Sequence, residues 1–409
     1  MKNRVASERL ERGLQLRQGE GNMSDREFDV VLHGASGFTG RLAVAYFARH
    51  APAGFRWAIA GRDLARLKSI EANVPILVFD SSSQAGVDAA VARTRVLLST
   101  AGPFREYSDA LVDACVRLRT HYIDISGESV RIRDLIDRYH QRAVEARVRI
   151  VTLCGFSSVP ADLAVYLLNK SLAGRLAEAK GFFQMGGGSF NGGTISSMAN
   201  AHVSGDVERE RDPFLLVPGH RGAAERIEDD AKGVRYDRTI GAWTAPSPMA
   251  TSDTRAILRS AALGGNRVIY QESMVFPGLG GMVRAIGFAA VIGALDAMMR
   301  NGVTRNLLQK LIPPGSGPSE KAMDAAWFEL RVYGSTKEGA KAEAVIRGNG
   351  DASNRITVKC VCEGALAMVL DEAALPTAYG ILTPSAAFGD VLVQRLVVAG
   401  LEIRVMGLP

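Results

Sequence analysis

The sequence predicts an α/β fold in which a doubly wound parallel sheet is joined to a second, α+β domain with a mainly antiparallel sheet. Up to about residue 155, short apolar segments rich in β-branched residues alternate with segments of helical periodicity. Farther along, apolar and polar residues alternate one by one, which is typical of antiparallel strands with one buried face. The 409 residues are also enough for two domains, since one domain usually holds about 100–200 residues.

Six apolar segments are predicted to form the strands of the parallel sheet. They are residues 28–33, 56–60, 75–79, 96–99, 121–125 and 149–153. The helices predicted between them are residues 39–50, 63–70, 84–93, 108–117 and 130–145. Because strands and helices alternate, the sheet should be parallel and covered by helices on both faces.

Antiparallel strands are predicted in the second half of the chain. In Trp327–Tyr333 the side chains of Phe328, Leu330 and Val332 share one face of a strand. Two further strands with weaker alternation are predicted at Ala342–Arg347 and Arg355–Val361. The tail is predicted to form a helix at 384–396 and a strand at 401–405.

The composition excludes several classes of protein. The net charge is only +6, and basic residues do not cluster with aromatic ones as a nucleic-acid-binding surface requires. The four cysteines lack the spacing of a zinc site, so we expect reduced thiols and no metal. The N-terminal residues do not resemble a signal peptide. We therefore expect a cytoplasmic protein that binds neither nucleic acid nor metal.

A glycine-rich turn joins the first predicted strand to the first helix. Its sequence is Gly34-Ala35-Ser36-Gly37-Phe38-Thr39-Gly40. Gly34 would turn the strand end, Gly37 would let the backbone approach a pyrophosphate, and Gly40 would let helix and strand pack closely. The helix N-terminus would offer free N–H groups and a positive dipole end to the phosphates. The turn therefore predicts a Rossmann-type dinucleotide site.

The ends of the next three strands indicate that the dinucleotide is NADP(H). Gly61-Arg62 ends the second strand, where an NAD site would place an acidic residue, and the Arg62 guanidinium suits a 2′-phosphate. Asp80 follows the third strand, where it could reach the adenine, and a loop of small residues follows the fourth, beside the expected nicotinamide. The residues of that loop assigned to the cofactor are Ser99, Thr100, Ala101, Gly102 and Pro103.

The cofactor prediction divides the chain into four segments. Residues 1–22 are expected to be a disordered or non-native extension, and residues 23–155 to form the NADP-binding domain. Residues 156–380 are expected to form the substrate domain, and residues 381–409 to pack back on the core as a helix and a strand.

The candidate catalytic residues are less clearly defined. A reduction needs a proton or hydrogen-bond donor beside the nicotinamide. Tyr107, Glu128 and Cys154 lie near the carboxyl ends of the fourth to sixth strands, so each could serve.

Several segments resemble a known family across nearly the whole chain. They are REFDVVLHGASGFTGRL, AIAGRDLARL, LLSTAGPFREYSDALVDAC, YIDISGE, CGFSSVPADLAVYLL and GILTPSAAFGDVLVQRL. These segments resemble the saccharopine dehydrogenase-like oxidoreductases and, within them, the trans-acting enoyl reductases. The resemblance implies NADPH-dependent reduction of the carbon–carbon double bond of an unsaturated acyl thioester, carried by a partner polyketide or fatty-acid synthase. The developing enolate would need donors such as the N–H groups of Gly193 and Thr194.

Two other functions remain open from the sequence. A saccharopine dehydrogenase-type amine or imine oxidoreductase would need arginines that bind a substrate carboxylate, for which Arg209, Arg211 and Arg255 are candidates. A non-catalytic, lipid-associated protein that binds NADP would need no catalytic group at all.

The apolar stretch 276–299 bears on the partners of the protein. Arg284 and Asp296 enclose an uncharged run of only eleven residues, Ala285–Leu295. This run is shorter than the roughly 20 residues of a membrane-spanning helix. We therefore expect no transmembrane span. The stretch could instead form a buried helix, the contact of a homodimer, or a lipid-facing flap that associates with membranes.

Overall fold

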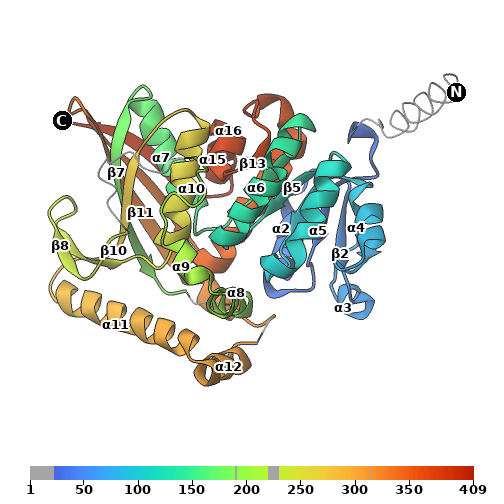
Figure 1. Ribbon diagram of the computed structural model, residues 1–409, viewed down its shortest axis with the longest axis horizontal. Coiled ribbons are helices and arrows are strands. Elements are labelled where there is room, and N and C mark those ends of the chain that lie inside the picture. The colour runs from blue at the N-terminus through green and yellow to red at the C-terminus, as the bar shows by residue number, and fades with distance from the viewer. Residues whose placement is uncertain (1–22, 189–190, 220–229, 314) are drawn as a thin grey trace, which may run out of the picture.

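The computed structural model describes residues 23–188, 191–219, 230–313 and 315–409, so the predicted extension 1–22 lies outside the described residues. Two sheets of seven strands each lie side by side (Figure 1). The first sheet has, in spatial order, β13 (Gly380–Leu382), β6 (Arg149–Val151), β5 (His121–Asp124), β4 (Thr94–Ser99), β1 (Phe28–His33), β2 (Trp57–Gly61) and β3 (Ile76–Val78). Every pair in it is parallel, which confirms the predicted doubly wound sheet.

Helices cover both faces of the first sheet. They are α2 (Phe38–His50) and α14 (Thr357–Leu370) on one face, and α4 (Gln84–Val91), α5 (Phe104–Arg117) and α6 (Ser129–Glu145) on the other. The short helix α3 (Leu64–Lys68) follows β2 at the edge. Alternate strand residues bury their side chains in opposite layers: Val30 and Leu32 pack with the α2 side and Val31 with the α5 side.

The second sheet is mixed, and all its strands come from the part of the chain after α7 (Val159–Ser171). Its strands, in spatial order, are β14 (Glu402–Leu408), β12 (Lys341–Asn349), β11 (Trp327–Thr336), β7 (Leu176–Gly186), β10 (Ile269–Phe276), β9 (Ala242–Pro246) and β8 (Arg235–Asp237). Only the β7–β10 pair is parallel within these described strands. This confirms the prediction of a mainly antiparallel sheet.

The remaining helices surround the second sheet and the junction. They are α7 (Val159–Ser171), α8 (Gly192–Ser204), α9 (Asp206–Glu210), α10 (Ala250–Leu263), α11 (Gly281–Arg300), α12 (Gly302–Leu311), α13 (Glu320–Asp324), α15 (Pro384–Phe388) and α16 (Asp390–Val398). Short 3-10 turns occur at Met23–Asp25 and Glu372–Ala374, and a π-helical turn at Ala352–Ile356 leads into α14.

The alternation in β11 is confirmed, whereas the strand predicted at Arg355–Val361 is wrong. Phe328, Leu330 and Val332 are all fully buried on one face of β11. Residues 355–361 instead enter α14, which packs against α2, β4, β5 and α16. A helix enclosed on all sides is apolar around its whole circumference, so it lacks the usual helical period and its β-branched start resembles a strand.

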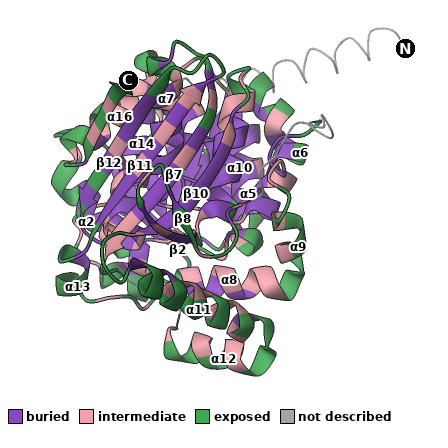
Figure 2. Ribbon diagram, turned by 90° about the vertical axis from the view of Figure 1, so that its left-hand side faces the viewer, coloured by how far each residue is buried: buried purple, intermediate pink, exposed green. Residues whose placement is uncertain are grey.

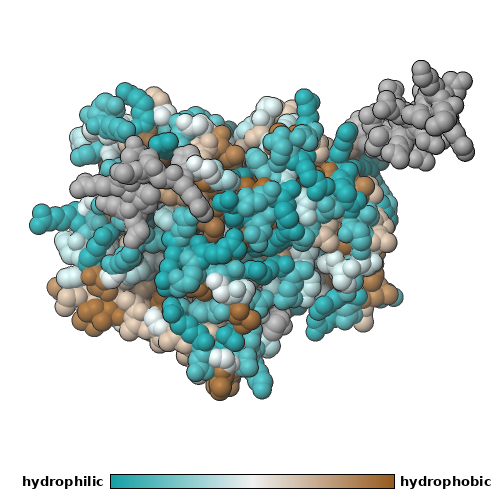
Figure 3. All heavy atoms as spheres, in the orientation of Figure 1, coloured by the Kyte–Doolittle hydropathy of each residue, from teal (hydrophilic) through white to brown (hydrophobic). Residues whose placement is uncertain are grey.

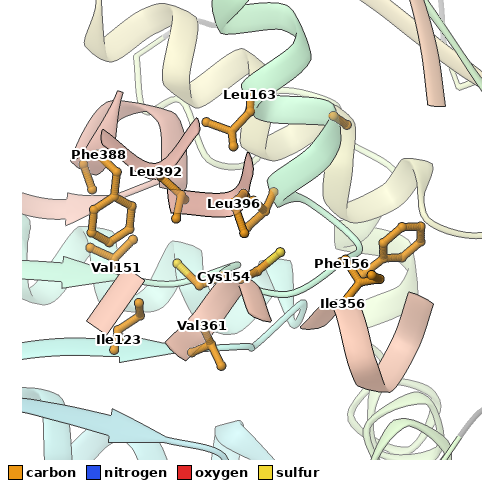
Figure 4. Close-up of a cluster of buried hydrophobic side chains, with 14 of the residues drawn as sticks. Ile123, Val151, Cys154, Phe156, Leu163, Ile356, Val361, Phe388, Leu392 and Leu396 are labelled. Atoms are coloured by element: carbon orange, nitrogen blue, oxygen red, sulfur yellow. The ribbon is translucent and has the colours of Figure 1, made fainter. Parts of the chain in front are cut away.

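One hydrophobic core joins the two halves of the chain. Phe156, just after β6, packs edge-to-face on Phe183 of β7 and Phe328 of β11, with ring centroids 5.7 and 4.8 Å apart. Figure 4 shows Phe156 beside Ile356, in the same cluster as Cys154. The C-terminal segment also connects both halves, because β13 extends the first sheet and β14 the second. The two sheets are therefore held together by shared packing.

Most of the apolar stretch 276–299 forms the surface helix α11, so the structure excludes the buried helix among the three alternatives left open by the sequence. Most of α11 is exposed (Figure 2), and Gly281, Ala285 and Met299 are its buried residues. Within the described residues, α11 is the one helix long and apolar enough to cross a membrane by length and composition. The helix contacts β9 and β10 of the second sheet, and its buried Met299 packs against α8 and α12.

Candidate functional site

A cleft of about 330 Å³ lies at the carboxyl ends of β1, β2, β3 and β4. Ligands of open α/β sheets bind at this edge. The first domain contributes His33, Gly34, Ser36, Gly37, Phe38, Thr39, Gly61, Arg62, Asp63, Arg66, Phe79, Asp80, Ser81, Thr100, Ala101, Gly102 and Tyr107. The rest of the chain contributes Asn191, Gly193 and Gly315. The cleft thus lies between the first sheet and α8 of the second domain.

The glycine-rich turn forms one wall of the cleft in the predicted way. Gly34 has a φ of +82°, and a Cβ there would lie 2.7 Å from the main-chain nitrogen of Ala101, so only glycine fits. The N–H of Thr100 donates to the carbonyl of His33 at 2.9 Å, which ties the loop after β4 to the turn. Helix α2 begins after Gly37 without a side-chain cap, so its first N–H groups are available to an anion.

Four of the predicted cofactor residues support the cleft without lining it. Ala35 is fully buried and Gly40 is enclosed at the start of α2. The buried hydroxyl of Ser99 contacts Nδ1 of His33 at 3.3 Å. Pro103 is the N-cap of α5. The other eleven predicted residues line the cleft.

Two arginines line the cleft near the carboxyl end of β2. Arg62 follows β2 as predicted, and Arg66 comes from the short helix α3. Asp63 caps α3, since its Oδ1 accepts the N–H of Arg66 at 3.1 Å. Asp80 accepts the N–H and the hydroxyl of Ser82, both at 2.8 Å, and these bonds lower the pKa of its carboxyl. The arginines fit a 2′-phosphate, which the cleft can hold together with a pyrophosphate on α2.

His33 lies at the base of the cleft and was missed by the sequence analysis. Its ring stacks on Phe79 with centroids 4.9 Å apart, and its Nε2 contacts the hydroxyl of Ser81 at 3.4 Å. Burial lowers the pKa of His33 to about 4, so the ring is neutral at physiological pH. A neutral histidine here shapes the site without adding charge.

Tyr107 and Gly193 line the cleft from different parts of the chain. Tyr107 is half-buried on α5, and Gly193 is in the first turn of α8. Asn191 caps α8, because its Oδ1 accepts the N–H of Thr194 at 3.0 Å. The Asn191 amide also donates to Asn354 at 2.7 Å. The main-chain N–H of Thr194 is therefore engaged in the helix cap.

Glu128 positions the helix that carries Tyr107 and does not line the described cleft. Its carboxylate accepts the N–H groups of Phe104 and Arg105, at 3.1 and 2.8 Å, at the start of α5. The same carboxylate accepts the hydroxyl of Ser197 from α8 at 2.8 Å. Glu128 thus connects α5, which carries Tyr107, with α8, which carries Gly193.

Cys154 does not reach the cleft. Its side chain is fully buried beside Ile123 and Val361 in the shared core (Figure 4). Burial raises the pKa of its thiol well above the usual value. The chain turns back into the core directly after β6, and this turn separates Cys154 from the site.

The arginines considered for a substrate carboxylate form ion pairs elsewhere. Arg209 pairs with Asp134 at 3.5 Å, and Arg211 with Glu208 at 2.9 Å. Arg255 is fully buried and pairs with Asp230 at 2.7 Å. None of these three arginines belongs to the cleft lining.

Besides His33, the sequence-based prediction missed six residues that line the cleft: Asp63, Arg66, Phe79, Ser81, Asn191 and Gly315. Asn191 precedes Gly192-Gly193-Thr194, and an asparagine before a helix start is a recognised cap, so this residue could have been found. Arg66 is near Arg62 in sequence but reaches the cleft only because α3 is one short turn. Gly315 is positioned by tertiary contacts, including a 3.2 Å hydrogen bond from Arg41 to its carbonyl.

Comparison with known proteins agrees with the geometry of the site. The model of the saccharopine dehydrogenase NADP-binding domain matches residues 30–151. A Mycobacterium tuberculosis protein named as a trans-acting enoyl reductase is 36% identical, over 93% of this chain and 97% of its own length. The trans-acting enoyl reductase of Mycobacterium ulcerans is 32% identical, over 93% and 98%.

A solved structure shows the same fold. Saccharopine dehydrogenase (L-Glu forming) from Saccharomyces cerevisiae superposes with a TM-score of 0.53 at 13% identity, covering 93% of this chain and all of that one. The family model, which matches the domain that carries the phosphate turn and Arg62, identifies the cofactor as NADP(H). The chain therefore belongs to the saccharopine dehydrogenase-like oxidoreductases, in the family of the trans-acting enoyl reductases.

Proposed function

We propose that this protein is an NADPH-dependent enoyl reductase that reduces the carbon–carbon double bond of an unsaturated acyl thioester. The acyl chain would be presented by a separate lipid- or polyketide-building synthase, as the names of the relatives suggest. The observation that carries the proposal is the cleft, whose lining combines the glycine-rich turn and two arginines with Tyr107 and Gly193.

The chain supplies binding, orientation and hydrogen-bond donors. When bound, NADPH supplies the hydride that is added to the β-carbon of the acyl thioester. Negative charge then develops on the thioester oxygen, and the α-carbon must receive a proton. Donors aimed at that oxygen stabilise the transition state, and a proton donor completes the reduction.

Of the first main-chain N–H groups of α8, two already donate hydrogen bonds within the protein. The N–H of Gly192 donates to the carbonyl of Ser316 at 3.0 Å, and that of Thr194 donates to Asn191. Gly193 lies between them and lines the cleft. We therefore assign the oxygen contact to the N–H of Gly193 and proton donation to the hydroxyl of Tyr107, with Glu128 as a positioning residue.

A panel of substrates tests this function. Purified protein should oxidise NADPH with 2-enoyl thioesters and not with pairs of 2-oxoacids and amines. Tyr107→Phe should lower kcat at least about tenfold while the Kd for NADPH stays unchanged, because the hydroxyl acts only on the substrate. Tyr166→Phe on α7 is the matched control and should keep full activity. Turnover only with oxoacid–amine pairs would instead assign the saccharopine-type reaction, and no turnover with any acceptor would indicate a non-catalytic NADP-binding protein.

The arginine pair predicts a preference for NADPH over NADH. Arg62→Ala combined with Arg66→Ala should weaken NADPH binding about tenfold to a hundredfold and leave NADH binding nearly unchanged. The reason is that only NADPH carries the 2′-phosphate. Fluorescence titrations with NADPH and with NADH measure the two affinities. An equal loss of affinity for both cofactors would contradict the assignment of the two arginines to the 2′-phosphate.

The location that we propose is cytoplasmic. All four cysteines are buried free thiols, which is compatible with a reducing compartment. Association with membranes or with a second copy of the chain depends on the surface of α11 and α12.

A further inference from the structure

Helix α11 leaves a long apolar surface uncovered. Met282, Val283, Ile286 and Val291 are 43%, 69%, 52% and 66% exposed, and Leu279 just before the helix is fully exposed. Figure 3 shows hydrophobic side chains along the lower edge of the molecule, where Figure 1 places α11 and α12. Exposed apolar patches of this kind usually mark interaction sites.

Helix α12 continues this surface. Val303, Leu307 and Leu311 are 80%, 53% and 69% exposed. They are spaced four residues apart, so they lie on one side of the helix. A neighbouring side of the helix faces the protein, where Leu308 and, just after the helix, Ile312 pack against Met299. Helix α12 therefore has apolar residues on two sides, and only one of these sides is covered by the rest of the protein.

The exposed surface is connected to the cleft by α8. Ile195 and Ala199 of α8 form a small core with Met299 and with Leu308 and Ile312. The first turn of the same helix places Gly193 in the cleft. A molecule held on α11 and α12 would thus lie against the helix that leads to the substrate end of the site.

The charge of this surface is positive. Residues 281–312 contain Arg284, Arg300, Arg305 and Lys310 and a single acidic residue, Asp296. Asp296 forms an ion pair with Arg300 at 2.9 Å and a hydrogen bond with His202 of α8 at 3.1 Å. Arg284, Arg300 and Lys310 are exposed beside the apolar side chains. Apolar helices bordered by arginine and lysine complement an anionic lipid headgroup layer.

We propose that α11 and α12 form an interfacial membrane-binding surface that docks the enzyme on an anionic bilayer. The apolar side chains would enter the headgroup region and the basic ones would contact lipid phosphates. Helix α11 would lie in the plane of the membrane, because Ala285 and Met299 keep it attached to the fold along its length. A second copy is less well matched, since two such surfaces would bring like charges together.

The experiment measures vesicle binding without substrate or cofactor, so its failure is distinct from failure of the proposed enoyl reduction. The full chain is sedimented with vesicles of phosphatidylcholine alone, or of phosphatidylcholine and phosphatidylglycerol in equal parts. We expect binding to the anionic vesicles, with at least about tenfold weaker binding to neutral ones and a decrease as salt is raised. Absence of binding to either vesicle would overturn the proposal.

Matched variants locate the binding surface. Val291→Glu on α11 should reduce binding to anionic vesicles at least about tenfold, because a carboxylate would enter the interface. Val398→Glu at the end of α16 is the control, since Val398 is 89% exposed but lies away from α11. NADPH binding by each variant shows that it is folded. Equal vesicle binding by the two variants would overturn the proposal. A dimer in analytical ultracentrifugation that is dissociated by Val291→Glu and not by Val398→Glu would also overturn it, because that result would assign the surface to a second copy of the chain.

Discussion

NADPH binding is expected to fall by about a hundredfold or more when Gly40 is replaced by alanine. A Cβ at this position would lie 2.1 Å from the carbonyl oxygen of Gly34 and 2.9 Å from the backbone of Ala35. Non-bonded atoms do not approach this closely, and neither obstacle is a flexible side chain. Helix α2 must therefore move away from the glycine-rich turn. That movement separates the helix N-terminus from the other N–H groups that would hold the pyrophosphate.

Isothermal titration with NADPH measures this effect, and circular dichroism shows whether the variant is folded. Gly293→Ala is the matched control, because Gly293 is also inside a helix but a Cβ there would meet nothing within 4 Å. This control should bind NADPH normally and gain up to about 1 kcal/mol of stability from helix propensity. If Gly40→Ala is unfolded, Gly37→Ala gives a milder test, since its Cβ would lie 3.3 Å from the Gly34 oxygen. Normal NADPH binding by a folded Gly40→Ala protein would contradict the role assigned to this glycine.

The cofactor half of the site could be predicted because its signals are local. Gly34, Arg62 and Thr100 each follow directly after an apolar strand, and parallel strands bring such residues to one edge of the sheet. The family resemblance added the reaction class, which the spacing alone does not contain.

The substrate half was harder to predict because tertiary contacts create it. Asn191 and Gly315 reach the cleft only after α8 and the connection before α13 have packed against the first domain. Helix α14 was mistaken for a strand because it is buried on all sides. The exposure of α11 could not be derived either, since a buried helix and an exposed apolar helix have the same composition.

Two buried carboxyl groups beneath the second sheet share an environment that favours protonation. Asp253 of α10 and Glu272 of β10 are 0% and 1% exposed, and after burial the neighbouring Glu272 is the next cause that raises the pKa of Asp253. Serines 158 and 252 donate to Oδ1 of Asp253 at 3.4 and 3.3 Å, and Tyr270 donates to Oε2 of Glu272 at 3.0 Å. Oδ2 of Asp253 and Oε1 of Glu272 have no hydrogen-bond partner among the described residues. A proton between the two groups is what makes this contact favourable.

The pair makes the stability of the fold depend on pH. Burial raises the pKa of Glu272 to about 7 and that of Asp253 well above its usual value. In the unfolded chain these groups titrate near pH 4. The folded protein therefore binds more protons than the unfolded chain between these values. The resulting stabilisation is fully present below about pH 4 and is lost as the pH rises through about 7.

Asp253→Asn should reduce this dependence while keeping the packing, because it removes one of the two buried titrating groups. The asparagine amide can donate to Glu272 without a shared proton, so the loss of unfolding free energy from pH 5 to pH 8 should be about 2 kcal/mol smaller than in the wild type. Urea titrations at several pH values measure it, and the comparison cancels the contributions of Asp124, Asp162 and Glu210, whose pKa values are also raised. Glu272→Gln should have the same effect, and the double variant should add little, because the two groups titrate as one unit. Identical pH profiles for wild type and Asp253→Asn would show that the carboxyl groups share no proton and that another feature stabilises their contact.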